Sequence, residues 1–402
     1  MAKPSHQDYP VTLSVATVMS LKHVREQCAR VADQAHISID ADQVDAFLRG
    51  IRADEFDALK LQHGLRFPLR FASFHHKLNF IAVLSMLNAF SGYRVDFHRV
   101  TGHGAYDCVR RIVLAMYLTT HDEEGHTPLD AHALETVTVA SLAQALGVPT
   151  HTETPHPTIP FITVGTVGGP LQEPLELAAQ MCTETAAFLR EHGYQDLASY
   201  VLDVCEQALE QEHVEAYMAS QLARISAFDD AINIDGVRVC LWKKALFFVH
   251  ALYNILMDVD EDSVADLPAP LRALARRWRH GLCEPLPMFV DNVIPTILSY
   301  LGILRFHHEH VLASWHPAPQ GDNSNVPGPT LERRDAYCVR AAALIAGSRI
   351  IERAHDLANT DASMAWMACM TEEQLDAYIW TWAKSPVLRS IPRLVERLTG
   401  MY

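Results

Sequence analysis

Apolar residues recur at the spacing of an α-helix in stretch after stretch of this 402-residue chain. Each such stretch has one apolar face to bury, and many of them in series favour a fold of packed helices. A further segment, 36–50, indicates a short extended piece followed by a helix that ends at Gly50. The spacing predicts helices over 24–34, 75–90, 105–120, 174–193, 197–225, 241–257, 293–304, 334–358 and 371–384.

Segments that resemble strands are few. The best candidate is 158–169, and 65–73 could also be extended. Two stretches rich in proline and polar residues, 147–160 and 314–330, have the composition of surface loops. The fold class predicted from these patterns is all-α, mainly helical with few short strands.

The domain organisation follows from the absence of a clear break in composition. Neither loop stretch is long enough to separate two domains. We therefore predict an N-terminal extension over residues 1–26 and a single helical domain over 27–402. Within that domain, loop insertions are expected near 149–160 and 316–330.

Composition narrows the class of partner and the compartment. The net charge is −15, so the chain lacks the basic surface that polymeric nucleic acid requires, although a small anion could still bind in a local basic pocket. The eight cysteines are scattered without a C-x-x-C pair, which favours reduced thiols. The N-terminus has no apolar signal core, and the longest apolar stretch, 245–257, is too short to cross a bilayer. We expect a cytoplasmic protein with no membrane partner.

The histidine-rich segments raise a metal hypothesis. A helical metal site needs ligands on one face and a third ligand nearby, and catalysis adds a general base. His307 and His310 could share a face, but no HExxH motif is present. The ordinary interpretation is a set of surface histidines, so we predict no metal and keep a His-rich metallohydrolase as the weakest alternative. The histidines concerned are His121, His126, His307, His308, His310 and His316.

Three charged residues in apolar surroundings are candidates for function. Asp291 lies in the apolar stretch 286–304, where its ordinary role would be to cap a helix. Asp376 lies among aromatic residues, either exposed in the first helical turn or buried with an altered pKa. Lys243 begins an apolar helix, as a solvated helix start or as part of an anion pocket.

Several segments, taken in order, resemble the queuosine salvage protein family, the queuosine-nucleotide N-glycosylases. The anchors of that family fall in the same order here, from about residue 27 to residue 402. No single anchor is specific, but the ordered set is moderately so. The segments are RVADQAHISIDADQVDAFL, LNFIAVLSMLNAF, LWKKALFFVHALYNIL, LPMFVDNVIPTILSYLGIL, CVRAAALIAGSRII and the terminal run from LDAYIWTWAKS to RLTGMY.

The resemblance implies a fold and a reaction. The fold would be a helical one similar to that of DNA glycosylases. The reaction would be hydrolysis of the N-glycosidic bond of queuosine 5′-monophosphate, or of a related modified nucleotide, which releases queuine for salvage into tRNA modification. The family implies a small-molecule nucleotide or nucleobase as partner and no cofactor. It leaves the oligomeric state open.

The resemblance also assigns roles to residues. Phe289 and Asp291 match the base-binding phenylalanine and aspartate of the family. A carboxylate can accept paired hydrogen bonds from the amidine edge of a guanine-like base, and a phenyl ring can cover its face. Asp376 matches the catalytic aspartate, which would stabilise an oxocarbenium-like sugar or act as nucleophile. His63 aligns loosely with a ligand-contacting histidine, and Lys243 is the phosphate candidate by charge.

The chain departs from the family pattern around the substrate. The tyrosine after the catalytic aspartate is Ala377 here, and the second aspartate is Thr381. These two positions would belong to the substrate-binding set, so their replacement leaves two other hypotheses open. One is activity on another nucleoside phosphate, and the other is a non-catalytic helical protein that binds a small molecule or a partner. Further departures are Leu246, Ala251, Asn292 and Val293.

Overall fold

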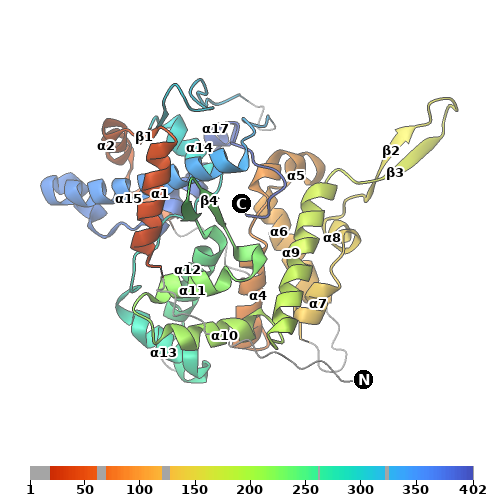
Figure 1. The fold of residues 1–402 in the computed structure, drawn as a ribbon, viewed down its shortest axis with the longest axis horizontal. Coiled ribbons are helices and arrows are strands. Elements are labelled where there is room, and N and C mark those ends of the chain that lie inside the picture. Colours follow the sequence, from red (N-terminus) through yellow and green to blue (C-terminus); the bar gives the residue numbers. More distant parts are fainter. Residues whose placement is uncertain (1–18, 61–68, 120–126, 261–262, 322–325, 402) are drawn as a thin grey trace, which may run out of the picture.

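The computed structural model describes residues 19–60, 69–119, 127–260, 263–321 and 326–401. Helices contain 60% of the residues and strands 7%, so the predicted all-α class is confirmed. Figure 1 shows one group of helices around α1, α14 and α15 and a second group around α5, α6 and α9, with α4 and α12 below and between them. In the described residues, no helix is both long and apolar enough to cross a membrane.

The described ranges contain seventeen α-helices, five short 3₁₀ helices and six strands. The first α-helices are α1 (Leu21–Gln34), α2 (Ala41–Gly50), α3 (Ala53–Leu59), α4 (Phe74–Met86), α5 (Arg94–Thr101), α6 (Ala105–Thr119), α7 (Ala131–Glu135), α8 (Val139–Leu146) and α9 (Gln172–Glu191). The later ones are α10 (Leu197–Ala208), α11 (Val214–Leu222), α12 (Lys243–Met257), α13 (Ala269–Arg277), α14 (Val293–Tyr300), α15 (Arg333–Thr360), α16 (Glu372–Trp382) and α17 (Pro386–Arg389). The 3₁₀ helices are η1 (Ser91–Tyr93), η2 (Ser226–Phe228), η3 (Ser263–Asp266), η4 (Trp278–His280) and η5 (Ala362–Cys369). The strands are β1 (Ile37–Ile39), β2 (His151–Pro155), β3 (Thr163–Val167), β4 (Ala231–Ile234), β5 (Val237–Cys240) and β6 (Leu304–Phe306).

The long helix α15 organises one side of the core. It contacts α1, α2, α14 and α16 along its length. Its N-terminal half is rich in alanine, which lets neighbouring elements approach its backbone closely. At Gly347 an added Cβ would lie 2.6 Å from Cε of Met288, so a larger residue there would displace that side chain. The segment that precedes α14 is thereby pressed against α15.

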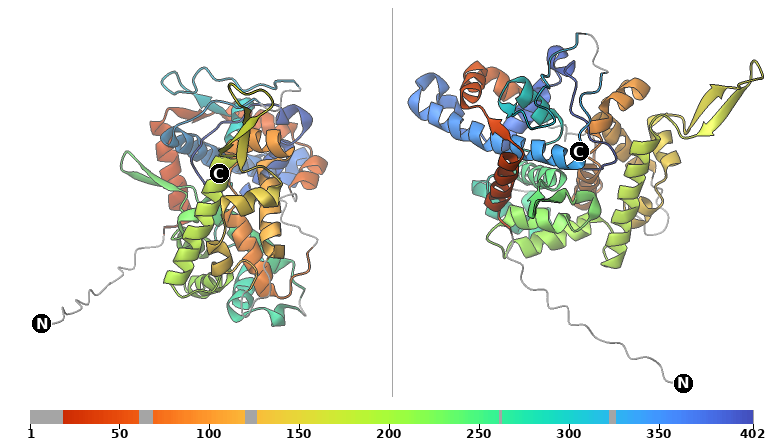
Figure 2. Two further views of the ribbon diagram at one scale, coloured as in Figure 1. Left: turned by 90° about the vertical axis from the view of Figure 1, so that its right-hand side faces the viewer. Right: turned by 45° about the horizontal axis from the view of Figure 1, so that its top comes forward.

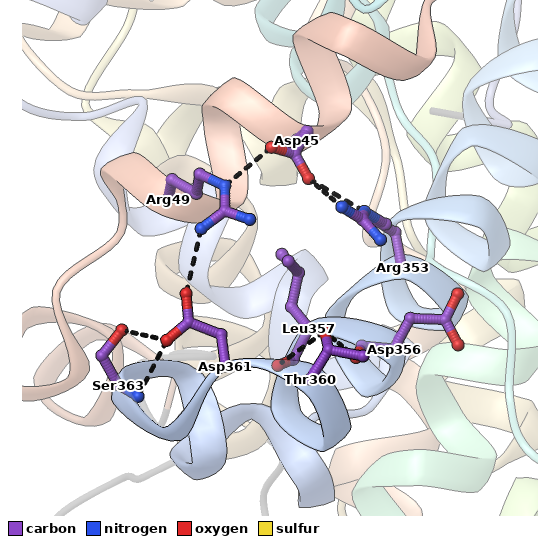
Figure 3. Close-up of polar contacts among 8 residues, drawn as sticks. All are labelled: Asp45, Arg49, Arg353, Asp356, Leu357, Thr360, Asp361 and Ser363. Atoms are coloured by element: carbon purple, nitrogen blue, oxygen red, sulfur yellow. Dashed lines mark hydrogen bonds and ion pairs between the residues drawn. The ribbon is translucent and has the colours of Figure 1, made fainter.

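An ion-pair cluster at the surface joins α2 to the far end of α15 (Figure 3). Asp45 accepts hydrogen bonds from Arg49, at 2.7 Å, and from Nε of Arg353, at 2.9 Å. Arg49 also reaches Asp361 at 3.1 Å, and Asp361 caps η5 through the backbone N–H of Ser363. The cluster therefore links α2 to the junction of α15 and η5, 312 residues further along the chain.

Two predicted helices are wrong in their extent, and one of them, 293–304, ends as α14 at Tyr300 because Leu304 belongs to β6. The segment 197–225 forms two helices, α10 and α11, separated by residues 209–213. A single helix of that length would extend about 43 Å, at 1.5 Å per residue. The turn instead brings the apolar face of α11 back against α10 and α12. The polar run from Glu210 to His213 has no apolar face to bury, which makes it the place for the turn.

The strands form three antiparallel pairs in the described residues. β1 pairs with β6, which confirms the predicted extended piece before α2, and β4 pairs with β5 across an Asp235–Gly236 turn. β3 confirms the strand predicted within 158–169. The loop predicted near 149–160 is wrong over His151–Pro155, because these residues form β2 and pair with β3. Both faces of this hairpin are exposed, so its sequence carries no alternation of apolar and polar residues.

The other loop and the N-terminal boundary are partly described. Residues 314–321 and 326–329 contain no helix or strand, as expected, and Thr330 forms a bridge with Val395. The described part of 65–73 is an irregular segment that leads into α4. The boundary expected at residue 26 falls inside α1, whose residues Leu21 and Val24 are buried against the body of the protein.

Candidate functional site

A small cavity lies where the end of α4, the start of α6, α12, α16 and the segment before α14 meet. Four of the predicted residues line it, namely Lys243, Phe289, Asp291 and Asp376. These residues are up to 133 positions apart, the separation of Lys243 and Asp376, and the fold brings them to one place. The other lining residues are Asn88, Tyr106, Phe247 and Trp380.

Phe289 and Asp291 belong to the buried segment before α14, which contacts α15. Nε of Arg340 donates a hydrogen bond of 3.0 Å to the carbonyl oxygen of Val290, which lies between the two cavity residues. The contact between Met288 and Gly347 restrains the same segment further along α15. The guanidinium of Arg340 is itself held by Asp230, at 2.6 and 2.9 Å. The position of the segment thus depends on a buried ion pair.

Asp291 lies at the start of α14 and at the wall of the cavity. Its Oδ1 accepts a hydrogen bond of 2.6 Å from the backbone N–H of Val293, the first residue of α14. Asp291 is 6% exposed and also lines the cavity. In the described residues no hydrogen bond to Oδ2 is seen. One oxygen therefore caps the helix and the other remains for a ligand.

Asp376 is buried in the second turn of α16. Its Oδ1 accepts a hydrogen bond of 3.0 Å from the backbone N–H of Phe289. Burial raises the pKa of Asp376 well above its usual value, and the neighbouring charge of Asp291 adds to this increase. The N–H of Phe289 and the ammonium of Lys243 act in the opposite direction. Of the two interpretations of Asp376, the buried carboxyl is confirmed, and the exposed first-turn aspartate is wrong.

Phe289 forms part of an aromatic wall. Its ring lies 6.0 Å from the ring of Phe247, edge to face, and 5.4 Å from the imidazole of His250. Phe247 and His250 are both on α12, three residues apart, so they project from the same face of that helix. The face of the Phe289 ring is apolar and flat, which suits contact with a flat ring system.

Lys243 is not a solvated helix start. It is 6% exposed, and its Nζ donates to the carbonyl oxygen of Asn88 at 2.8 Å and to Oδ1 of Asn88 at 3.4 Å. Burial lowers the pKa of Lys243, while the charge of Asp291 raises it. An ammonium has three donors, and both of these acceptors belong to one asparagine. Lys243 can therefore also face an anion in the cavity.

Tyr106 and Trp380 also line the cavity. Their rings meet edge to face at 5.7 Å, and Nζ of Lys384 lies 3.2 Å above the Trp380 ring. The buried hydroxyl of Tyr106 has no hydrogen-bond partner in the described part of the chain. Trp380 follows Asp376 by four residues, and this spacing on one helix face was a usable signal. Phe247 follows Lys243 by four residues on α12 in the same way, whereas for Tyr106 and Asn88 the sequence carried no comparable signal.

Not every predicted residue reaches the cavity. Ala377 is fully buried and Thr381 is partly buried, and neither is among the lining residues. Ala377 and Asp376 are adjacent on α16 and therefore point about 100° apart. The hydroxyl of Thr381 is buried and has no partner in the described residues. His63 lies outside the described residues.

The histidine-rich segment 307–316 lies away from this cavity, next to β6. His307 contacts Ser38 at 3.0 Å, and His310 stacks on Phe306 and accepts a hydrogen bond from the N–H of Leu312. His121 and His126 lie outside the described residues. In the described ranges no group of three histidine, cysteine, aspartate or glutamate side chains could hold a metal ion.

Comparison with known proteins finds no family model that matches the chain and no similar curated protein.

Proposed function

We propose that the protein is a nucleotide N-glycosylase that hydrolyses the N-glycosidic bond of queuosine 5′-monophosphate, or of a related modified nucleotide, and releases queuine. One observation carries the proposal. A buried carboxyl, Asp376, shares a cavity with a second carboxyl, Asp291, and with the ring of Phe289. Aromatic walls with a few convergent polar groups are typical of sites for small molecules.

The base would bind between Asp291 and Phe289. The amidine edge of a 7-deazaguanine presents two N–H donors, and a carboxylate accepts such a pair. The ring of Phe289 would cover the face of the base, supported by Phe247 and His250. Since Asp291 is anchored through the start of α14, the position of this acceptor is set before a ligand arrives.

Asp376 would act at the sugar. Cleavage breaks the bond between the anomeric carbon and the ring nitrogen, and the electron pair stays with the base, which then takes up a proton. Water forms the new bond to the anomeric carbon and loses a proton. A fixed carboxylate beside the sugar stabilises the positive charge that develops before water attacks. The hydrogen bond from the N–H of Phe289 fixes this carboxylate relative to the base-binding segment.

Lys243 and Tyr106 would bind the remaining polar groups of the nucleotide. The ammonium of Lys243 can approach an anionic phosphate as a point charge. The Tyr106 hydroxyl has a donor that no group in the described residues uses, and a ligand oxygen could accept from it.

A non-catalytic binding protein on the same scaffold is the second candidate. The observation that favours it is the composition of α16, where Ala377 and Thr381 replace a tyrosine and an aspartate of the family pattern and do not line the cavity. Such a protein would bind queuine or the nucleotide and release nothing.

One experiment separates the candidates. Purified protein and its Asp376→Asn variant are incubated with queuosine 5′-monophosphate, and free queuine is measured by mass spectrometry. Thermal shift with queuine and with the nucleotide is recorded in parallel. Release by the wild type alone supports the glycosylase. Binding without release supports the second candidate, and neither release nor a thermal shift contradicts both.

A further inference from the structure

The hairpin formed by β2 and β3 stands away from the rest of the protein. It follows α8 and precedes α9, and it projects from the body in both Figure 1 and Figure 2. Every residue of both strands is exposed. An isolated two-stranded hairpin is only marginally stable in water, and three or more strands are normally needed. The arm therefore has the properties of half of a larger sheet.

The composition of the arm differs from that of the whole chain. Residues 147–169 contain a single side chain that is charged at pH 7, Glu153, in a protein with a net charge of −15. The tip residue Phe161 is fully exposed, and Val167 is 93% exposed. Apolar side chains are thus concentrated on the one segment that carries almost none of the protein's charge.

The hydrogen-bond pattern identifies the free edge of each strand. Near the tip the N–H of His156 donates to the carbonyl oxygen of Ile162 at 2.7 Å. Near the base the N–H of Gly168 donates to the carbonyl oxygen of Thr150 at 3.1 Å. Directly opposite residues in an antiparallel pair alternate between bonded and non-bonded, so the groups of residues 163, 165 and 167 point away from β2.

The two free edges are not equivalent. The outer edge of β2 contains Pro155, which has no N–H, and has Glu153 at its centre. The outer edge of β3 has a complete set of donors and acceptors and no charged side chain. Natural proteins usually protect such an edge with charges, prolines or bulges. The edge of β3 has none of these protections.

We propose that two copies of this chain associate through β3, antiparallel and about a two-fold axis at Gly165, to form a four-stranded sheet. In this register Gly165 of each copy faces Gly165 of the other, and Thr163 faces Val167. Each of these pairs exchanges both backbone hydrogen bonds. Two-fold symmetric dimers, in which the same surface of each copy forms the interface, are the commonest homo-oligomers.

The distribution of charge favours association of two copies through β3 over association through β2 or through the bodies. Association of the two β2 edges would place Glu153 opposite Glu153, which is unfavourable. Association through the bodies would bring together surfaces that carry nearly all of the net charge of −15 on each chain. Contact through the uncharged edge of the arm avoids both.

Engineered cysteines test the register. The background is the full chain with the exposed residues Cys283 and Cys369 replaced by serine. In the proposed dimer the Cα atoms of the two residues 165 are about 5.5 Å apart, within disulfide range. A Cβ at Gly165 meets only Cδ2 of His151, at 3.5 Å, so Gly165→Cys fits the hairpin. The matched control is Glu153→Cys, directly opposite on β2, whose two copies would be about 14 Å apart.

Sedimentation equilibrium over a range of protein concentrations accompanies the cross-linking. The expected result is a wild-type mass that rises towards twice the monomer, and a covalent dimer from Gly165→Cys that forms much faster than from Glu153→Cys. Faster cross-linking of Glu153→Cys would overturn the proposed edge. A monomer at all concentrations, with equal slow cross-linking of the two variants, would overturn the dimer itself.

Discussion

The backbone N–H of Phe289 donates a hydrogen bond of 3.0 Å to Oδ1 of Asp376, across 87 residues of sequence. The residue proposed to cover the base is thus joined directly to the residue proposed to act on the sugar. The bond crosses from the segment before α14 to α16, and both of its partners line the same cavity. Substitutions at Asp376 therefore have a structural part and a chemical part, which different variants can separate.

Asp376→Asn is expected to abolish turnover and leave the fold intact. The amide oxygen of asparagine can still accept from the N–H of Phe289, whereas the negative charge is lost. Asp376→Ala removes the acceptor too, and leaving that buried N–H unpaired should lower the free energy of unfolding by about 1–3 kcal/mol. Urea denaturation and queuine release measure the two parts. Substantial release by Asp376→Asn would contradict the role of its charge.

The raised pKa of Asp376 predicts how stability depends on pH. The unfolded chain loses this proton near pH 3.9, and the folded protein keeps it to a higher pH. Between these two values the folded state binds more protons, so the free energy of unfolding falls as the pH rises. Asp376→Asn has no such proton. Its stability relative to the wild type should therefore increase as the pH rises from about 4, and then level off.

The same shift predicts an effect on activity. If the ionised carboxylate stabilises the sugar cation, turnover should rise with pH through the raised pKa of Asp376. Release of queuine measured at a series of pH values under saturating nucleotide checks this. A rate that is constant from pH 4 upwards would contradict a raised pKa for the catalytic group.

The adjacent residues Lys243 and Lys244 allow a matched comparison. Lys243 lines the cavity, while Nζ of Lys244 donates to the carbonyl oxygen of Gly400 at 2.5 Å. Lys243→Met should weaken nucleotide binding by about 10- to 100-fold, the loss of one charged hydrogen bond of about 1.5–3 kcal/mol. Lys244→Met should leave binding unchanged. Titration calorimetry with the nucleotide compares the two, and equal losses would contradict the phosphate role of Lys243.

The lowered pKa of Lys244 also predicts how the free energy of unfolding depends on pH. Burial, with the charge of Lys243, lowers the pKa of Lys244 to about 7. The unfolded chain keeps this proton up to about pH 10.4, so the free energy of unfolding should rise as the pH increases from about 7. Lys244→Met is expected to flatten this rise in denaturation experiments, whereas a variant at an exposed lysine such as Lys22 should not.

Helices were predictable because their burial leaves a local pattern. The apolar spacing of α12 and α15 is visible over four or more turns, and both helices were predicted within two residues of their ends. The strand β2 left no such pattern, because a hairpin exposed on both faces has no apolar side to mark. The turn between α10 and α11 depends on where the rest of the core lies, which no local window contains.

The sequence predicted residues of the cavity only where a charged side chain occurs among apolar residues. Asp291 and Asp376 are carboxyls in apolar sequence, and Lys243 is a cation at the start of an apolar helix. Asn88 and Phe247 are ordinary in their own segments, and only the packing of α4 against α12 brings them together. Ala377, which the family resemblance put in the substrate-binding set, does not line the cavity, because adjacent residues on α16 point about 100° apart.

The buried pair of Asp230 and Arg340 offers the sharpest test of how the site is held. Nη1 and Nη2 of Arg340 donate to the two oxygens of Asp230, and both side chains are almost completely buried. Arg340→Met leaves Asp230 as an uncompensated buried charge, which should lower the free energy of unfolding by about 3–5 kcal/mol. Arg334, on the same helix as Arg340, forms an exposed ion pair with Asp235 of the β4–β5 turn, and Arg334→Met should change stability little. Urea denaturation compares the two, and similar losses would contradict the role of burial.

Replacing Asp230 and Arg340 together distinguishes the effect of this pair on the stability of the protein from its effect on the position of the segment that contains Phe289 and Asp291. Asp230→Leu combined with Arg340→Met replaces the pair by apolar groups and should recover much of the lost stability, because no unpaired charge remains. The hydrogen bond from Arg340 to the carbonyl oxygen of Val290 is still missing in this double variant. The segment that carries Phe289 and Asp291 then loses its lateral support, so nucleotide binding should stay weak although the fold is restored. Full recovery of binding in the double variant would mean that the packing of Met288 against Gly347 is enough to hold the segment.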